Sequence, residues 1–156
     1  MFSENLKKPL FASRLNSMGA RRDLWSGDND VLDWIARQGT IKGLDLIDFN
    51  CPQHLQGRNV EEIISTLEQA SLKTGAICTR FPSEFENGAF THPEERQRKA
   101  AIELVLNAAE WARSLDANEL VVWSAYDGYD YSLQSDYTLM WKHCVEAFQI
   151  ICDAFP

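Results

Sequence analysis

Residues 88–123, GAFTHPEERQRKAAIELVLNAAEWARSLDANELVVW, predict a long helix that runs directly into a strand. Pro93 suits the first position of the helix, where its missing N–H costs nothing, and Thr91 or His92 is placed to cap it. The apolar periodicity predicts that the helix continues to about Leu115. The strand that follows is continuously apolar, which is typical of a parallel strand covered on both faces.

The same alternation of helix and strand extends over the rest of the chain. The other expected elements are a short apolar segment at Pro9–Met18, a helix at 27–39, a strand at Ile41–Asn50, a helix at Asn59–Gly75, a strand at Ala76–Phe81, the quoted strand continuing through ELVVWSA (119–125), and a helix from about Asp136 to Ala154. Asp28 or Asn29 is expected to cap the first of these helices and Gly39 to end it, while Asn59 caps the next.

This order predicts an α/β fold of four βα units with parallel strands joined by right-handed crossovers. An open doubly wound sheet satisfies it, and so does half of an eight-stranded TIM barrel. A dinucleotide-binding fold is disfavoured because no GxGxxG turn follows any strand, and no Walker loop is present either.

Composition limits the function further. The chain has 156 residues and a formal charge of −8, enough for one domain but unsuited to binding nucleic acid. Without a signal peptide or a long apolar run, it is expected to be soluble and cytoplasmic. The cysteines are widely spaced, which favours core thiols in a reducing compartment over a disulfide framework or a zinc site. They are Cys51, Cys78, Cys144 and Cys152.

Polar residues gather where the predicted strands end. In a parallel α/β fold the carboxyl ends of all strands lie at one face, which is where ligands bind. The residues expected at this rim are Ser13, Arg14, Asn16, Asp48, Asn50, Gln53, His54, Arg80, Glu84, Trp123, Tyr126, Asp127, Asp130 and Tyr131. The opposite loops carry ordinary turns.

Four segments together resemble a known family. They are FASRLNS (11–17), LDLIDFNCPQHL (44–55), the quoted residues 88–123, and DGYDY (127–131). The chain resembles the amino-terminal half of a xylose-isomerase-like TIM barrel, from the superfamily of sugar isomerases and epimerases. It is most similar to a branch of uncharacterised sugar isomerases.

The resemblance implies an enzyme that interconverts aldoses and ketoses or epimerises ketoses with a divalent metal, Mn²⁺, Mg²⁺ or Co²⁺. In that family the metal ligands come mainly from strands five to eight, so no bound metal is expected in this half and it is expected to be inactive alone. The alternative is a non-catalytic carbohydrate-binding or assembly module with the same rim. Endonucleases acting at abasic sites share the barrel, but the acidic charge argues against them.

The resemblance also suggests roles at the rim. His54 matches a catalytic histidine that touches sugar oxygens or assists proton transfer, or it is a loop histidine bonded to backbone. Asn50 would orient it or bind hydroxyls. Trp123 matches an aromatic wall beside the substrate, although a core position explains it equally.

Three charged rim residues are further candidates for substrate binding, each with a structural alternative. Asp127 and Asp130 could accept hydrogen bonds from sugar hydroxyls, whereas a tight Asp-Gly turn would explain the same sequence. Arg14 could anchor a carboxylate or phosphate, or pair with a rim acid. Asn16, near the end of the first strand, is a further substrate-binding candidate.

The length predicts a partial domain. A full barrel needs about 250 residues, so residues 1–156 are expected to form one partial barrel that is truncated after the fourth helix, at IICDAFP (150–156). Three explanations of this length are open. The second half is missing, two copies close one barrel as a homodimer, or the sheet stays open with one edge covered by the amino-terminal segment. Because the first and last strands would be open edges, self-association is expected.

Overall fold

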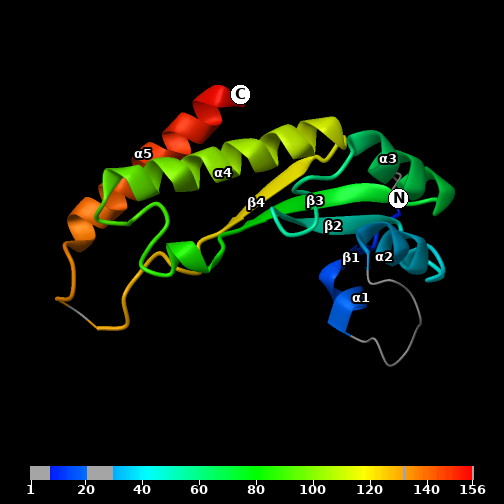
Figure 1. Cartoon of the computed structure of the whole chain (residues 1–156), viewed down its shortest axis with the longest axis horizontal. Helices are drawn as coiled ribbons and strands as arrows, with labels where there is room; N and C mark the ends of the chain where they lie inside the picture. The colour runs from blue at the N-terminus through cyan, green and yellow to red at the C-terminus, as the bar shows by residue number, and fades with distance from the viewer. Residues whose placement is uncertain (1–7, 21–29, 132, 156) are drawn as a thin grey trace, which may run out of the picture. The chain divides into compact units, whose positions relative to one another are not determined.

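A computed structural model of the chain describes residues 8–20, 30–131 and 133–155. The elements in chain order are β1 (Ala12–Arg14), α1 (Asn16–Ala20), α2 (Val31–Gln38), β2 (Leu46–Cys51), α3 (Val60–Gln69), β3 (Lys73–Arg80), the 3₁₀ turn η2 (Ser83–Phe85), α4 (Glu95–Ser114), β4 (Glu119–Trp123) and α5 (Tyr137–Ala154), as Figure 1 shows. The predicted alternation of strand and helix is therefore confirmed.

The strands form one parallel sheet in the order β1-β2-β3-β4. In the first pair Ala12 lies opposite Leu46. In the last pair Arg80 lies opposite Trp123, so β3 and β4 end side by side. This topology confirms the α/β fold, and it is the topology of half a TIM barrel.

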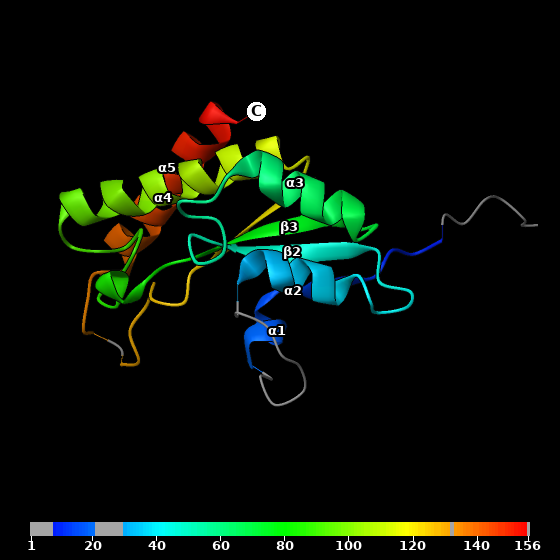
Figure 2. The same cartoon turned by 45° about the vertical axis from the view of Figure 1, so that its right-hand side comes forward.

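The chain divides into two compact units. Unit one comprises Met1–Phe49 and Gly57–Gly75, and unit two comprises Asn50–Gln56 and Ala76–Pro156. Within unit one, α2 packs against α1 and α3 (Figure 2). The approach of α2 and α3 is close at Gly39, because a Cβ there would lie 2.8 Å from the Cβ of Ala70. Glycine is required at this position for steric reasons.

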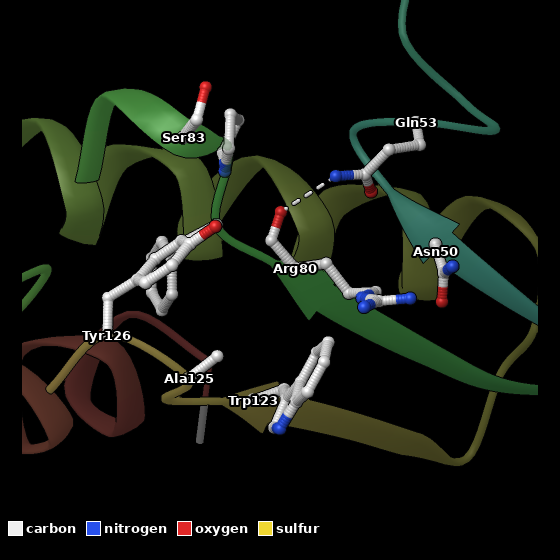
Figure 3. Close-up of a pocket in the computed structure, with 9 residues that line it drawn as sticks. Asn50, Gln53, Arg80, Ser83, Trp123, Ala125 and Tyr126 are labelled. Atoms are coloured by element: carbon white, nitrogen blue, oxygen red, sulfur yellow. Dashed lines mark hydrogen bonds between the residues drawn. The ribbon is translucent and has the colours of Figure 1, made fainter. Parts of the chain in front are cut away.

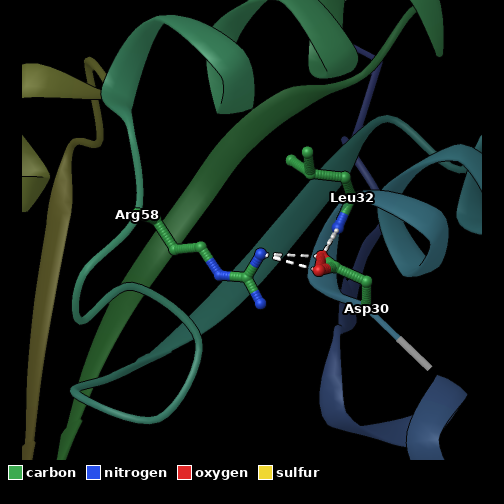
Figure 4. A network of polar contacts seen from close by, with 3 residues as sticks. All are labelled: Asp30, Leu32 and Arg58. Carbon is green, nitrogen blue, oxygen red and sulfur yellow. Dashed lines mark hydrogen bonds and ion pairs between the residues drawn. The ribbon is translucent and has the colours of Figure 1, made fainter. Parts of the chain in front are cut away.

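Local capping fixes the helix starts in unit one. Asp30 caps α2 by accepting a hydrogen bond from the Leu32 N–H at 3.0 Å, and its carboxylate also pairs with Arg58 at 2.8 Å (Figure 4). The expected caps, Asp28 and Asn29, lie outside the described residues.

At the start of α3, Asn59 accepts from the N–H groups of Glu61 and Glu62 at 2.7 and 3.2 Å, as predicted. The helix ends at Gln69, however, and not at Gly75.

The early end of α3 has a local cause. Ser71 takes the left-handed conformation, with φ 57°, and its N–H donates to Glu68 O, while the Leu72 N–H reaches Leu67 O at 3.0 Å. These two bonds form a Schellman motif, in which glycine is the usual residue at the left-handed position. Because serine at this position gives no clear stop signal, the sequence predicted a helix that is too long. The predicted strand therefore began at Ala76, whereas β3 begins at Lys73.

The second strand is also shorter than predicted. The expectation ran from Ile41 to Asn50, whereas β2 begins at Leu46 and continues to Cys51. The Leu44 N–H instead donates to Ile41 O at 3.2 Å, which closes a turn over residues 41–44.

Unit two has an aromatic core beneath its two long helices. Phe81 and Phe90 are buried with their ring centroids 5.5 Å apart, and Phe85 lies 5.4 Å from Phe81. α4 runs against β4 and α5 packs beside α4 (Figure 1). The aliphatic side chains of Val105 and Ile151 from the two helices complete this core.

The start of α4 differs from the prediction. The helix begins at Glu95, so Pro93 is not its first residue, and neither Thr91 nor His92 is its N-cap. Thr91 is instead bonded to Asp127. His92 accepts a hydrogen bond from the Glu94 N–H at 3.0 Å just before the helix. The end of α4 at Ser114 agrees with the expectation of about Leu115.

Two burial predictions are wrong. β4 was expected to be covered on both faces, but Val121 is 37% exposed and Trp123 46% exposed. The exposed residues alternate along the strand, so α4 covers one face of β4 and the other face, with Val121 and Trp123, is open. The thiol of Cys152 was expected in the core but is exposed, whereas Cys51 is buried.

Candidate functional site

A pocket of about 310 Å³ lies in unit two where strands end (Figure 3). Its lining comes from the ends of β2, β3 and β4 and from the loops after them, which agrees with the predicted position of the rim. The lining residues are Asn50, Gln53, Arg80, Phe81, Pro82, Ser83, Trp123, Ala125 and Tyr126. Two of the predicted substrate-binding residues, Asn50 and Trp123, are therefore brought together here.

Asn50 contributes a side-chain amide to the wall of this pocket. The residue is only 5% exposed, and its backbone is fixed in both directions by His54: the Asn50 N–H donates to Nδ1 at 2.9 Å, and the His54 N–H donates to Asn50 O at 2.9 Å. Within the described part of the chain its side-chain amide has no hydrogen-bond partner. Because this amide lines the pocket with its donors and its acceptor unused by the protein, a ligand there can bond to it.

The Arg80 side chain lies over the ring of Trp123. The guanidinium carbon is 4.0 Å from the ring centroid, a cation–π contact that follows from the register of β3 and β4. Gln53 donates to the carbonyl oxygen of Arg80 at 3.0 Å and so holds the loop after β2 against the end of β3 (Figure 3). One face of the Trp123 ring is thus occupied by a cation.

The structure favours a backbone-bonded His54. The side chain is 5% exposed, its Nδ1 accepts the Asn50 N–H, and it does not line the pocket. Since Nδ1 is an acceptor, Nε2 is the nitrogen that carries a proton in the neutral ring. A catalytic role for His54 stays a prediction.

Asp127 connects two loops of unit two. Its Oδ1 accepts hydrogen bonds from the Ala89 N–H at 2.9 Å, the Thr91 N–H at 3.0 Å and the Thr91 hydroxyl at 2.8 Å. The neighbouring Gly128 has φ 150°, as a turn at this position requires. The Asp127 carboxylate is thus hydrogen-bonded within the protein. Asp130 is exposed and lies outside the pocket lining. Sugar binding by either residue stays a prediction.

Arg14 and Asn16 belong to unit one and do not line the pocket. The carbonyl oxygen of Arg14 accepts a hydrogen bond from the Gln38 amide at 3.2 Å. Asn16 is the first residue of α1, a helix where the sequence predicted the end of the strand. Their roles in substrate binding stay predictions.

Sequence reasoning placed Gln53, Arg80 and Tyr126 at the rim without giving them a role, and it missed Ser83. A role for Arg80 beside Trp123 required the register of β3 and β4, in which these two residues lie opposite each other. Ser83 lies in η2, a 3₁₀ turn of Ser83–Phe85 that the loop sequence gave no clear signal for.

The family resemblance implies a divalent metal ion, which needs several ligating side chains close together. Among residues 8–20, 30–131 and 133–155, histidine, cysteine, aspartate and glutamate form no group of three or more that could hold a metal ion. This part of the chain therefore does not fit a complete metal centre.

The helices of the described residues were also compared with what a bilayer requires. None of them combines the length and the hydropathy of a membrane-spanning segment.

Comparison with known proteins supports the fold. No protein-family model and no curated protein matches the sequence. Among solved structures, the chain is similar to an AP endonuclease of family 2 from Brucella melitensis, with TM-score 0.63, 18% identity, and coverage of 94% of this chain and 50% of that one. It is also similar to an L-ribulose 3-epimerase, with TM-score 0.60, 14% identity, and coverage of 92% and 45%.

These similarities define a class of fold. The chain has the fold of half a TIM barrel, and the predicted resemblance is confirmed at the level of the fold. It spans about half the length of the solved chains it matches. At such low identity the similarity concerns the fold, and activity has to be argued from the site.

Proposed function

We propose that the chain forms the sugar-binding amino-terminal half of a sugar isomerase or epimerase. The observation that carries this proposal is the pocket at the ends of β2, β3 and β4, where the unpartnered amide of Asn50 and the exposed ring of Trp123 face one space. Amides and hydroxyls bond to sugar hydroxyls, and an indole ring packs against the apolar face of a sugar.

The size and chemistry of the pocket suit a small polar ligand. Its volume of about 310 Å³ is at the lower end of ligand pockets, which is appropriate for a monosaccharide. The hydroxyl-bearing residues Ser83 and Tyr126 line it together with Gln53. A sugar of five or six carbons has enough hydroxyls to bond with several of these groups at once.

Catalysis is proposed for a complete barrel only. The described side chains do not fit a metal centre by themselves, so metal ligands would have to come from another polypeptide segment or chain. By itself this half is proposed to bind sugar without converting it. A non-catalytic carbohydrate-binding module would use the same pocket, and turnover by a completed barrel distinguishes the two.

A nucleic-acid substrate is less well supported, although one similar structure is titled an AP endonuclease. The formal charge of −8 opposes the phosphate contacts that dominate affinity for DNA. We therefore expect no binding of a DNA duplex containing an abasic site.

Saturation-transfer NMR with L-ribulose and D-fructose tests this proposal. Signal transfer to either sugar is expected in the wild-type chain and should weaken in Asn50→Ala, which removes the free amide without breaking a side-chain hydrogen bond of the protein. Asn118→Ala, at an exposed position before β4 that does not line the pocket, is the matched control. Absence of transfer to both sugars, or tight binding of the abasic duplex instead, would overturn the proposal.

A further inference from the structure

We propose that the pocket at the ends of β2, β3 and β4 selects sugars that carry an anionic group, a phosphate or a carboxylate, and that Arg80 binds that group. This inference rests on the proposed sugar-binding function and narrows its substrate class. It is argued from the surroundings of the Arg80 guanidinium and from the neutral polar groups that line the pocket beside it.

Arg80 is a cation without an anionic partner in the described part of the chain. Its side chain is half-buried, and its one described side-chain contact is the stacking on Trp123 at 4.0 Å. The ion pairs of the described residues involve other arginines and lysines, such as Arg58 with Asp30. The hydrogen-bond donors of the Arg80 guanidinium are thus available to a ligand.

The pocket supplies no carboxylate that could neutralise Arg80. No aspartate or glutamate lines it, and its polar residues besides Arg80 are neutral: Asn50, Gln53, Ser83 and Tyr126. Figure 3 shows Arg80 extending from the end of β3 into the space that Trp123 and Asn50 border. Since a guanidinium prefers a planar or tetrahedral oxyanion with two parallel hydrogen bonds, the ligand is the natural source of the missing charge.

Trp123 has a specific part in this arrangement. Stacking on the indole restricts the rotation of the arginine side chain and leaves the edge of the guanidinium free, so the cation is pre-organised for an incoming anion. The carbonyl of Arg80 is also held by Gln53 at 3.0 Å, which fixes the backbone from which the side chain extends. Trp123 is therefore a positioning residue for Arg80 as well as a wall of the pocket.

The second binding group is Asn50. Its side-chain amide lines the pocket and has no hydrogen-bond partner among the described residues, although the residue as a whole is only 5% exposed. An amide can donate to an anionic oxygen or bond to a neighbouring hydroxyl, but a bare anion leaves part of it unsatisfied. A ligand with both a charge and hydroxyl groups uses Arg80 and Asn50 together, which favours an anionic sugar over an inorganic ion.

A matched series of ketoses tests the inference. D-Fructose 6-phosphate, D-fructuronate and D-fructose differ at carbon six, which carries a phosphate, a carboxylate or a neutral alcohol. Their dissociation constants are measured by calorimetry on the wild-type chain, with inorganic phosphate as a fourth probe. We expect the phosphate or the carboxylate sugar to bind about tenfold or more tightly than D-fructose, because hydrogen bonds to charged groups are the stronger kind.

Substitutions locate the effect. Arg80→Met should reduce the affinity for the anionic sugar to that for D-fructose, and Arg80→Lys should retain part of the preference. Arg96→Met removes the same charge from an exposed position on α4 and should change nothing. Circular dichroism verifies that each variant is folded.

The outcomes separate this inference from the sugar-binding proposal. Equal affinity for the three ketoses, or an anionic preference that survives Arg80→Met, would overturn the role of Arg80 while sugar binding stands. Binding of inorganic phosphate alone, lost in Arg80→Met, would keep an anion site and overturn sugar recognition. If none of the four probes binds, both proposals fail. Preference for the phosphate over the carboxylate sugar, or the reverse, identifies which anion the pocket takes.

Discussion

Asp127 illustrates how a single carboxylate can hold two loops beside a pocket together. Three hydrogen bonds converge on its Oδ1, from the backbone and hydroxyl of Thr91 and the backbone of Ala89. They hold the loop before α4 against the loop after β4, and Tyr126, next to Asp127, lines the pocket. The acid that sequence reasoning assigned to sugar binding thus has a structural role in the described residues.

Replacement of Asp127 tests this role. Asp127→Ala removes the acceptor for all three hydrogen bonds and should destabilise the chain by about 1–3 kcal/mol, the cost of leaving buried donors unsatisfied. Asp127→Asn keeps one carbonyl acceptor and should be milder. Urea unfolding gives both values. Equal stability of Asp127→Ala and the wild type would show that the loops do not depend on this carboxylate.

The cysteines differ in reactivity because they differ in burial. Burial raises the pKa of the Cys51 thiol to about 11, and the Cys152 side chain is exposed. Because the thiolate is the reactive form, iodoacetamide near neutral pH should modify Cys152 well before Cys51. Peptide mass spectrometry over time measures both. Faster modification of Cys51 than of Cys152 in the folded chain would contradict the described burial.

At the scale of elements, the order of strands and helices could be predicted from sequence because apolar periodicity is a local signal. Asn59 and Asp136 were placed correctly at helix starts, since a cap bonds to backbone within three residues. Thr91 was not, because it bonds to Asp127, which lies 36 residues further along the chain. Contacts at such separation have no local signature.

The same limit explains the exposure of β4 and the missed part of the site. The sequence predicted that β4 is an edge strand, but its continuous apolar run left open whether Trp123 lies in the core or at the rim, where it is 46% exposed. Asn50 and Trp123 could be predicted as rim residues, because each lies at the carboxyl end of a strand and parallel strands end at the same face. The stacking of Arg80 on Trp123 needed the register of two strands separated by a long helix.

The start of α2 provides a prediction about an element. Asp30 both caps this helix and pairs with Arg58, and Asp30→Ala should destabilise the chain by about 1 kcal/mol or more, the typical value of a cap. Asp33→Ala, at an exposed acid in the first turn of the same helix, is the control and should have a smaller effect. The free energy of unfolding in urea measures both variants, and an equal effect would contradict a capping role.

The pair also makes stability depend on pH. The hydrogen bond from Arg58, followed by that from the Leu32 N–H, lowers the pKa of Asp30 from its ordinary value of 3.8. A carboxyl with a lowered pKa in the folded state stabilises the protein above its unfolded pKa and loses that contribution as pH falls through the folded pKa. The difference in stability between wild type and Asp30→Asn should therefore shrink below about pH 4.

At the scale of the whole molecule, apolar surface remains uncovered on unit two. The outer face of α5 carries a groove of about 420 Å³ among Trp141, Val145 and Phe148, and Trp141 is 72% exposed. β4 has side chains exposed beside only one neighbouring strand. Exposed apolar helix faces and edge strands favour association with a further chain.

We propose that a second copy of the chain covers this surface. An isologous dimer would place the exposed apolar face of α5 in one copy against the same face in the other. Light scattering should give a dimer for the wild type and a monomer for Trp141→Glu. Tyr131→Glu, at a residue that is 73% exposed but lies outside α5, should remain a dimer. A monomeric wild type would exclude self-association.

NMR chemical shifts report directly whether a sugar binds where β2, β3 and β4 end. In a titration of the ¹⁵N-labelled chain with L-ribulose, we expect shifts of the Asn50 side-chain amide and the Trp123 indole N–H, with little change in unit one. Shifts confined to other residues, or no shifts with either L-ribulose or D-fructose 6-phosphate, would contradict sugar binding at this site.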